Sequence, residues 1–181
     1  MRKLLILFII LIPNTSFSNE KFVNYLKEGK KIIFMRHALA PGTADPKNFN
    51  INDCSTQRNL NEEGRSQSKR IGNFFKNKNI RIDKVLSSEW CRCKDTAKYA
   101  FKNFKTFDAL NSFYDEKFNK FKKMQIKDLR KYIKEWNGNK NLILVTHYVV
   151  ILEMLNIPVS SGEIVVSNKK YKIIGSINIQ F

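Results

Sequence analysis

Compact apolar runs alternate with amphipathic stretches along the chain, which predicts strands separated by helices. The runs at 31–36 and 141–146 have the length and apolar content of buried strands. A helix is predicted over 62–77, because Asn61 can cap its first turn and apolar residues share one face. The other expected elements are helices over 22–27, 90–101, 125–136 and 149–155, strands over 84–87 and 105–107, and a closing hairpin of 164–167 with 171–179. This alternation indicates an α/β fold, a three-layer α/β/α sandwich with a largely parallel central sheet.

Two stretches lack a periodic pattern. Residues 38–57 are polar and contain Pro41, Gly42 and Pro46, so we expect a long loop there. Residues 108–124 favour neither a helix nor a strand, and we leave them unassigned. Gly138 is expected to end the helix that precedes the second buried strand.

The first eighteen residues follow a pattern of their own. A short basic start precedes an unbroken apolar run at 4–12, and small residues stand before a cut that would leave Asn19 as the new N-terminus. This pattern is typical of a signal peptide at 1–18, followed by one domain over 19–181. The apolar run is shorter than the roughly 20 residues that span a bilayer. The prediction is a periplasmic or secreted protein; an uncleaved anchor or a buried N-terminal segment are the alternatives.

The composition is that of a folded, strongly basic protein. Hydrophobic residues make up 43% and charged residues 27% of the chain, which excludes a disordered or collagen-like protein. Lysine and arginine number 33 against 16 acidic residues, a formal charge of +17. Such a surface attracts phosphates, nucleic acid or an anionic membrane surface, although a general compositional bias has the same effect. The aromatic residues stand at core spacing, so no nucleic-acid partner is expected.

Three cysteines occur, at Cys54, Cys91 and Cys93. An oxidising compartment permits one disulfide, and Cys91 and Cys93 are too close in sequence to bridge comfortably. We therefore expect Cys54 to pair with Cys91 or with Cys93; three reduced, buried thiols are the alternative. The cysteines and histidines lack zinc-ligand spacing, and no metal or cofactor is predicted.

The chain has two histidines, and each directly follows one of the long apolar runs. Since sites in such folds form at the carboxyl ends of strands, we expect His37 and His147 to face one crevice. Arg36 precedes the first histidine, and Arg92 begins a predicted helix whose free N–H groups favour an anion. Two histidines and two arginines around a crevice make a pocket for a dianion such as a phosphoryl group.

These residues carry a resemblance to a known family. Four segments, in the family's order and spread over most of residues 31–167, resemble motifs of the histidine phosphatase superfamily, the phosphoglycerate-mutase-like enzymes. The resemblance implies an α/β/α sandwich and a phosphatase that works through a phosphohistidine. The segments are RHA at 36–38, RNLNEEG at 58–64, SSEWCRCKDTA at 87–97 and VTH at 145–147.

The same resemblance implies roles for individual side chains. His37 would be the nucleophile that accepts the phosphoryl group. Arg36, Arg92 and His147 would hold the phosphoryl oxygens and offset the charge of the transition state. Arg58 is a further candidate for this phosphate pocket. Phosphoryl transfer needs positioning and positive charge, which the arginines supply without a metal.

The sequence departs from the family pattern at two points near the histidines. Ala38 stands where the family usually has glycine, and its methyl group is tolerated if the backbone there has a negative φ. Tyr148 stands where the phytase-like branch has aspartate, which argues against that branch.

The general acid is the largest departure. Many members carry a glutamate in a Leu-x-Glu context, but the equivalent position here is Ser112. Asp115, Glu116 and Glu163 are the candidates to replace it, and a solvated loop charge is the alternative for the first two. Without an acid, substrates with good leaving groups, such as a phosphohistidine or an acyl phosphate, would be favoured.

We therefore predict an exported phosphatase for phosphomonoesters. The short connections leave no room for a large cap over the site, which suits a phosphate on a bulky molecule such as an anionic cell-envelope glycolipid. The alternatives are a non-catalytic phosphate-binding protein on the same fold and a phosphohistidine phosphatase. Export argues against a phosphoglycerate mutase.

Overall fold

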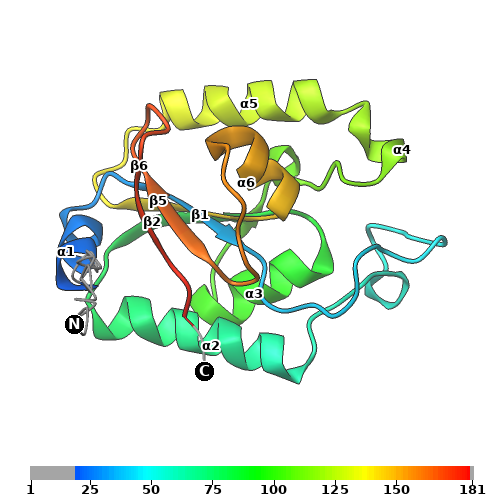
Figure 1. Ribbon diagram of the computed structural model, residues 1–181, viewed down its shortest axis with the longest axis horizontal. Coiled ribbons are helices and arrows are strands. Elements are labelled where there is room, and N and C mark those ends of the chain that lie inside the picture. The colour runs from blue at the N-terminus through cyan, green and yellow to red at the C-terminus, as the bar shows by residue number, and fades with distance from the viewer. Residues whose placement is uncertain (1–18, 180–181) are drawn as a thin grey trace, which may run out of the picture.

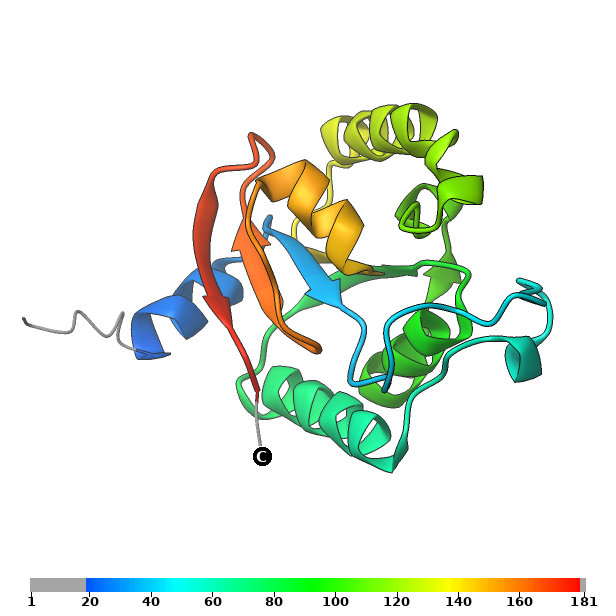
Figure 2. The same cartoon turned by 45° about the vertical axis from the view of Figure 1, so that its right-hand side comes forward.

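The computed structural model describes residues 19–179 as a central sheet with helices on both faces (Figures 1 and 2). The predicted signal peptide at 1–18 lies outside the described residues. In chain order the elements are α1 (Asn19–Glu28), β1 (Ile32–Arg36), η1 (Cys54–Thr56), α2 (Glu62–Asn77), β2 (Ile82–Ser87), α3 (Cys91–Phe101), β3 (Lys105–Thr106), η2 (Asp108–Leu110), α4 (Glu116–Asn119), α5 (Lys122–Glu135), β4 (Asn141–Thr146), α6 (Tyr148–Leu155), β5 (Ile164–Ser167) and β6 (Ile173–Ile177).

The sheet has six strands in the order β3-β2-β4-β1-β5-β6. β1, β2, β3 and β4 are mutually parallel, whereas β5 runs antiparallel to β1 and pairs with β6 as a hairpin. The expected α/β sandwich with a closing hairpin is confirmed, and the hairpin makes the sheet mixed. The order puts β1 and β4 at the centre, so the two apolar runs of the sequence are the buried middle of the sheet.

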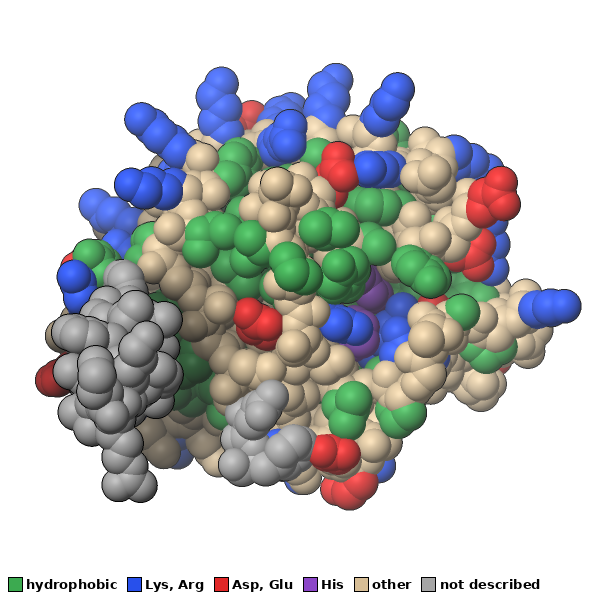
Figure 3. Space-filling model, in the orientation of Figure 1, with side chains coloured by type: hydrophobic (Ala, Val, Ile, Leu, Met, Phe, Trp, Pro, Cys, Tyr) green, Lys and Arg blue, Asp and Glu red, His purple; other side chains and the backbone are tan. Residues whose placement is uncertain are grey.

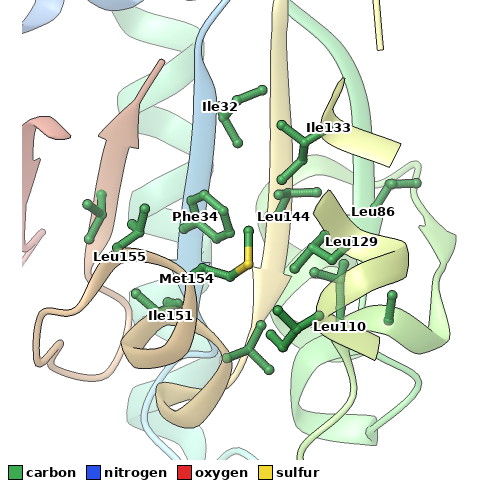
Figure 4. Packing of buried hydrophobic residues seen from close by; sticks show 14 of the residues in the cluster. Ile32, Phe34, Leu86, Leu110, Leu129, Ile133, Leu144, Ile151, Met154 and Leu155 are labelled. Carbon is green, nitrogen blue, oxygen red and sulfur yellow. The ribbon is translucent and has the colours of Figure 1, made fainter. Parts of the chain in front are cut away.

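Alternate side chains of the central strands enter two apolar cores, one on each face of the sheet. Ile32 and Phe34 of β1 point into the core under α5 and α6, and Ile33 and Met35 point into the core under α1, α2 and α3. Figure 4 shows Phe34 among the side chains of the first core, which include Leu129 of α5 and Met154 of α6. Because helices cover both faces, every residue of β1 and β4, except the last of β1, is buried.

Helix α2 begins as the sequence predicts. The Asn61 side chain accepts a hydrogen bond from the Gly64 N–H at 2.8 Å, and Glu62 and Glu63 lie in the first turn, where the helix dipole favours negative charge. A Cβ at Gly64 would lie 2.0 Å from the Leu39 carbonyl oxygen. Glycine at this position therefore lets α2 pack directly against the chain that leaves β1.

Several element boundaries differ from the prediction. Helix α5 starts at Lys122 and ends at Glu135, before Gly138, and Trp90 precedes α3 rather than belonging to it. The unassigned residues 108–124 hold a turn of 3-10 helix, the short helix α4 and the start of α5. Strand β5 is buried along its whole length. No helix within residues 19–179 is long and apolar enough to cross a membrane.

A disulfide fixes the connection between β1 and α2. Of the two pairings left open by the sequence, the structure has Cys54 joined to Cys91, and Cys93 is a free, buried thiol. Gln57 adds a second link, because its Oε1 accepts a hydrogen bond from the Cys91 N–H at 2.9 Å. This contact satisfies one of the free N–H groups at the start of α3. The loop is thus attached to the helix that carries Arg92.

Removing this disulfide is expected to lower the stability of the protein. The bond joins residues separated by 37 positions, and such cross-links typically contribute about 2–4 kcal/mol by restricting the unfolded chain. The double variant Cys54→Ala/Cys91→Ala should therefore unfold at lower urea concentration than the wild type. Reducing agent should shift the wild type to the midpoint of the variant and leave the variant unchanged; equal midpoints without reductant would contradict this prediction.

Candidate active site

The carboxyl ends of the parallel strands β1 and β4 lie at one edge of the sheet, with Arg36 in register with Thr146. His37 and His147 follow these ends, and their ring centroids are 5.5 Å apart. Both line a cavity of about 270 Å³. Figure 3 shows this hollow, with histidine in purple and basic side chains in blue at its base. The structure thus brings together the two histidines that the sequence places at strand ends.

His37 has one defined neutral form. Its Nδ1 lies 2.8 Å from the Ala38 carbonyl oxygen, and since a carbonyl only accepts, Nδ1 carries the hydrogen. The main-chain N–H of His37 donates to the Thr146 carbonyl at 2.9 Å, which holds the residue against β4. Burial, and then the positive charge of Arg92, lower the pKa of His37 well below its usual value. The ring is therefore neutral at pH 7, with an unprotonated Nε2.

Ala38 is accommodated without strain. Its φ is negative, since it is not among the described residues with positive φ, and its side chain is fully buried. The Ala38 N–H donates to Thr96 Oγ1 on α3 at 3.0 Å. The methyl group that replaces the family's usual glycine therefore fits this backbone.

A chain of hydrogen bonds fixes the ring of His147. Asn111 accepts from the Glu89 N–H through Oδ1 and donates to the Glu89 carboxylate through Nδ2, which sets the orientation of the amide. Ser88 Oγ therefore donates to Asn111 Oδ1 at 3.0 Å. The lone pairs of Ser88 then face His147 Nε2 at 2.9 Å, so Nε2 carries the hydrogen. Neutral His147 is left with an unprotonated Nδ1.

The surroundings of His147 keep it neutral and packed. Burial, and then the charge of Arg92, lower its pKa well below the usual value. The Trp90 ring meets the imidazole edge-on with centroids 5.4 Å apart. Cys93 Sγ lies 3.4 Å from Nε2, and burial raises the pKa of this thiol to about 12. Cys93 is thus an uncharged packing partner rather than a thiolate.

Three arginines surround the histidines. Arg36 donates to the Val159 carbonyl at 2.8 Å and lies over the Tyr148 ring, 5.6 Å from its centroid. Arg58 donates to a backbone carbonyl of the loop after β1. Burial lowers the pKa of both arginines, yet a guanidinium keeps its charge in proteins. The buried Nε atoms of Arg36, Arg58 and Arg92 have no hydrogen-bond partner among residues 19–179.

Asp45, which no motif in the sequence singles out, contacts the third arginine. Arg92, which is 3% exposed, donates to the two Asp45 oxygens at 2.7 and 3.2 Å. The carboxylate also accepts from the Trp90 indole and from the Arg58 main-chain N–H, each at 3.0 Å. Burial opposes ionisation, but the bonds and charge of Arg92 outweigh it and lower the pKa of Asp45. One signal was available, since Asp45 is the only acidic residue between 38 and 52.

Among the candidate general acids, Asp115 lines the cavity. It caps α4 by accepting from the Lys117 N–H at 3.2 Å, and its carboxylate lies 3.7 Å from Lys117 Nζ. Both side chains are about half exposed, so this ion pair is weak. Ser112, which replaces the family's glutamate, also lines the cavity.

The other two candidate acids do not line this cavity. Glu116 lies in α4 with an exposed side chain. The Glu163 carboxylate accepts from the Ser160 N–H at 2.8 Å, and its backbone carbonyl accepts from the Arg36 N–H. Glu163 therefore supports the backbone beside Arg36 rather than facing the histidines. Within the described chain, no three His, Cys, Asp or Glu side chains are grouped as metal ligands.

Stability should fall as the pH is lowered from 7.5 to 5.5. The pKa values of His37 and His147 are lowered in the folded protein, so below about pH 6.5 these histidines are protonated only after unfolding. The loss is roughly 1 kcal/mol per pH unit for each histidine. The lowered pKa of Asp45 makes stability depend on pH only below about pH 4, because above that pH the carboxylate is ionised in the unfolded chain as well.

Urea unfolding at several pH values checks this expectation. The variant His37→Gln/His147→Gln should show a clearly flatter dependence on pH than the wild type over this range. Equal slopes in the two proteins would mean that the histidines are not held neutral by the fold.

An arginine-lined cavity around paired histidines, at the carboxyl edge of an α/β sheet, defines a class of phosphoryl-binding proteins. The model of the histidine phosphatase superfamily (branch 1) matches residues 32–142. The chain belongs to this superfamily. The match contains His37 and the three arginines but ends before His147, so the geometry of the cavity, rather than the match, places the second histidine.

Solved structures of phosphatases share the fold. The protein histidine phosphatase SixA, complexed with tungstate, is 16% identical with a TM-score of 0.58, over 81% of this chain and 96% of that one. A mutant phosphoserine phosphatase from Entamoeba histolytica, in complex with phosphoserine, is 16% identical with a TM-score of 0.53, over 75% and 89%. A mycobacterial glucosyl-3-phosphoglycerate phosphatase is 11% identical with a TM-score of 0.52, over 76% and 92%. No curated protein sequence matches the chain.

Proposed function

We propose that this protein is a phosphatase that hydrolyses phosphomonoesters through a phosphohistidine at His37. The observation that carries the proposal is the Nδ1–H bond from His37 to the Ala38 carbonyl. This bond leaves Nε2 as the free nucleophilic atom of a neutral ring. Arg36, Arg58 and Arg92 line the same cavity, and their three positive charges suit a dianionic phosphoryl group.

In the first step, His37 Nε2 attacks phosphorus opposite the leaving oxygen. The N–P bond forms as the P–O bond breaks, and the leaving oxygen takes a proton from an acid or from water. The ring becomes a cation, and its Nδ1–H stays bonded to the Ala38 carbonyl. The arginines stabilise the phosphoryl oxygens as the charge spreads over them. His147 forms part of the wall of the same cavity, and its ring is held in place through Nε2 by Ser88.

In the second step, water attacks the phosphoryl group and the N–P bond breaks. The proton of the attacking water passes to the group that protonated the leaving oxygen, and inorganic phosphate is released. His37 returns to its neutral form. Asp115 is our candidate for the acid in the first step and the base in the second, since it is the one of the three candidates that lines the cavity.

The test is hydrolysis of 4-nitrophenyl phosphate by the chain from Asn19 onward, with EDTA present. This leaving group needs little protonation, so the assay does not depend on the acid. We expect turnover that inorganic phosphate inhibits competitively. A folded protein that binds phosphate without turnover would contradict the proposal and favour a non-catalytic phosphate-binding protein.

A phosphohistidine phosphatase is the second candidate function. Asp115 is half exposed and paired with Lys117, so it is poorly placed to serve as the general acid. This favours substrates whose leaving group needs little protonation. A phosphorylated imidazole is such a substrate. Asp115→Asn should lower kcat/KM for an alkyl phosphate but not for a phosphohistidine peptide; a loss on both substrates would exclude this candidate.

We also propose that the protein is exported after cleavage before Asn19 and acts at the anionic surface of the cell envelope. The apolar run at 4–12 and the net charge of +17 support this proposal. Exposed basic residues of α5 form part of a basic edge above the sheet (Figure 3). The test is N-terminal sequencing of the full chain expressed in a Gram-negative host. Asn19 as first residue in the periplasmic fraction is expected; an intact N-terminus in the cytoplasm would contradict it.

A further inference from the structure

A second cavity lies beside the phosphate cavity. It has a volume of about 640 Å³, and Trp90, Ser112 and Phe118 belong to the linings of both cavities. We call it the aromatic groove. Its other apolar lining residues come from the loop after β1 and from the start of α5: Phe49, Ile51, Phe121 and Met124.

The walls of the groove are flat rings. Phe49 stacks on Trp90 with centroids 5.0 Å apart, and Phe118 meets Trp90 edge-on at 5.3 Å. Phe121 and Met124 are 41% and 55% exposed, so the groove presents apolar surface to a ligand. A groove of this size with aromatic walls suits a flat apolar group.

One polar side chain that lines the groove has an atom without a partner. Gln125 is 8% exposed, and its Nε2 donates to the Asp108 carbonyl at 2.9 Å, which fixes the orientation of the amide. Its Oε1 is buried and has no hydrogen-bond partner among the described residues. A buried acceptor of this kind is costly unless a donor reaches it. A ligand in the groove would satisfy it with an N–H or O–H group.

The groove is also linked to the reacting groups. Asn111 lines it and accepts the hydrogen bond of Ser88, which in turn accepts from His147. Trp90 lines both spaces, and its ring meets the His147 ring edge-on. A substrate with its phosphoryl group at His37 can therefore extend its remaining part past Trp90 and Phe118.

We propose that the aromatic groove binds the leaving-group side of the substrate, and that this part is an aryl group carrying a hydrogen-bond donor. The inference rests on the phosphatase proposed above, because it takes the first cavity as the phosphoryl site. It adds the class of substrate: an aromatic phosphate rather than a small sugar or alkyl phosphate.

The test uses phosphonates, which bind without being hydrolysed. Dissociation constants for the chain from Asn19 onward are measured by calorimetry with benzylphosphonate, 1-naphthylmethylphosphonate and indol-3-ylmethylphosphonate. The second ring of the naphthyl compound should strengthen binding about tenfold over benzyl. The indole N–H should add a further severalfold gain through Gln125 Oε1.

Variants locate these gains. Phe121→Ala/Met124→Ala should remove most of the naphthyl advantage, whereas Leu152→Ala should keep it, because Leu152 is also an exposed apolar side chain, at 37%, but lies outside both cavities. Gln125→Met should remove the indole gain alone. Equal affinities for the three phosphonates, no binding at all, or gains that persist in the groove variants would overturn the inference. Turnover of 4-nitrophenyl phosphate is measured separately, so a failure of the phosphatase proposal is seen independently of the groove.

Discussion

Alanine in place of His37 is expected to lower kcat/KM for 4-nitrophenyl phosphate by roughly 10⁴-fold or more, the scale of loss when a nucleophile is removed from other enzymes. The side chain is 2% exposed and presents its unprotonated Nε2 to the arginine-lined cavity. Its two neighbours that carry nucleophilic atoms are less suited to attack. His147 is tied to Ser88 through Nε2, and Cys93 remains a protonated thiol.

Two controls separate lost chemistry from a lost fold. The variant should melt cooperatively and still bind inorganic phosphate, because the arginines remain. Imidazole added to the solution should restore part of the turnover by entering the space of the missing ring. A variant that keeps more than about one hundredth of the wild-type rate would show that His37 only assists another group, since proton transfer alone contributes about 10²–10⁴-fold.

Loss of Arg92 is expected to have the second largest effect. Arg92→Met should lower kcat/KM by about 10²–10³-fold, because a buried donor to the phosphoryl oxygens is removed. The same change leaves the Asp45 carboxylate without its 2.7 Å partner in a site where the side chain is 15% exposed. Breaking such a pair costs about 3–5 kcal/mol, so the free energy of unfolding should fall as well.

The double variant Arg92→Met/Asp45→Asn distinguishes the two roles of Arg92. It removes the unpaired carboxylate, so most of the stability should return while the rate stays low. Recovery of the rate together with the stability would mean that Arg92 serves only to neutralise Asp45. Arg130→Met, an exposed arginine on α5, is the matched control and should change neither quantity. Urea unfolding and steady-state kinetics provide both measurements.

The sequence predicts those residues of the site that lie at the ends of strands. His37 and His147 follow apolar runs that have to be central strands, because such runs are buried on both faces of a parallel sheet. Parallel pairing then brings their carboxyl ends to one edge, whatever the details of the loops. The helix dipole argument for Arg92 likewise depends only on its position at the start of α3.

Loop residues could not be placed in this way. Asp45 reaches Arg92 because the irregular chain at 38–57 folds back over the strand edge, and no periodicity encodes that path. Which cysteine pairs with Cys54 depends on which side of α3 faces the loop, and that is known only once α3 is placed against the sheet. Cys91 and Cys93 are about 200° apart around the helix, so one faces the loop and the other the sheet.

The candidate acids show the same limit. Glu163 directly precedes a strand, and its backbone carbonyl does lie beside Arg36. Its carboxylate, however, turns away to accept a hydrogen bond from the Ser160 N–H. Side-chain direction in a turn depends on local hydrogen bonds that spacing does not reveal. The Ser88–Asn111 contact that sets the tautomer of His147 joins residues 23 positions apart. No local pattern in the sequence predicts it.

The central claim is that a phosphoryl group passes through His37, and trapping the phosphoenzyme tests it most directly. The wild type is mixed with 4-nitrophenyl phosphate, quenched within milliseconds in base, and analysed by intact mass and peptide mapping. We predict one added phosphoryl group on the peptide that contains His37, stable in base, lost in acid and absent from His37→Ala. Rapid turnover with no phosphoenzyme, or with the group on another residue, would contradict the account.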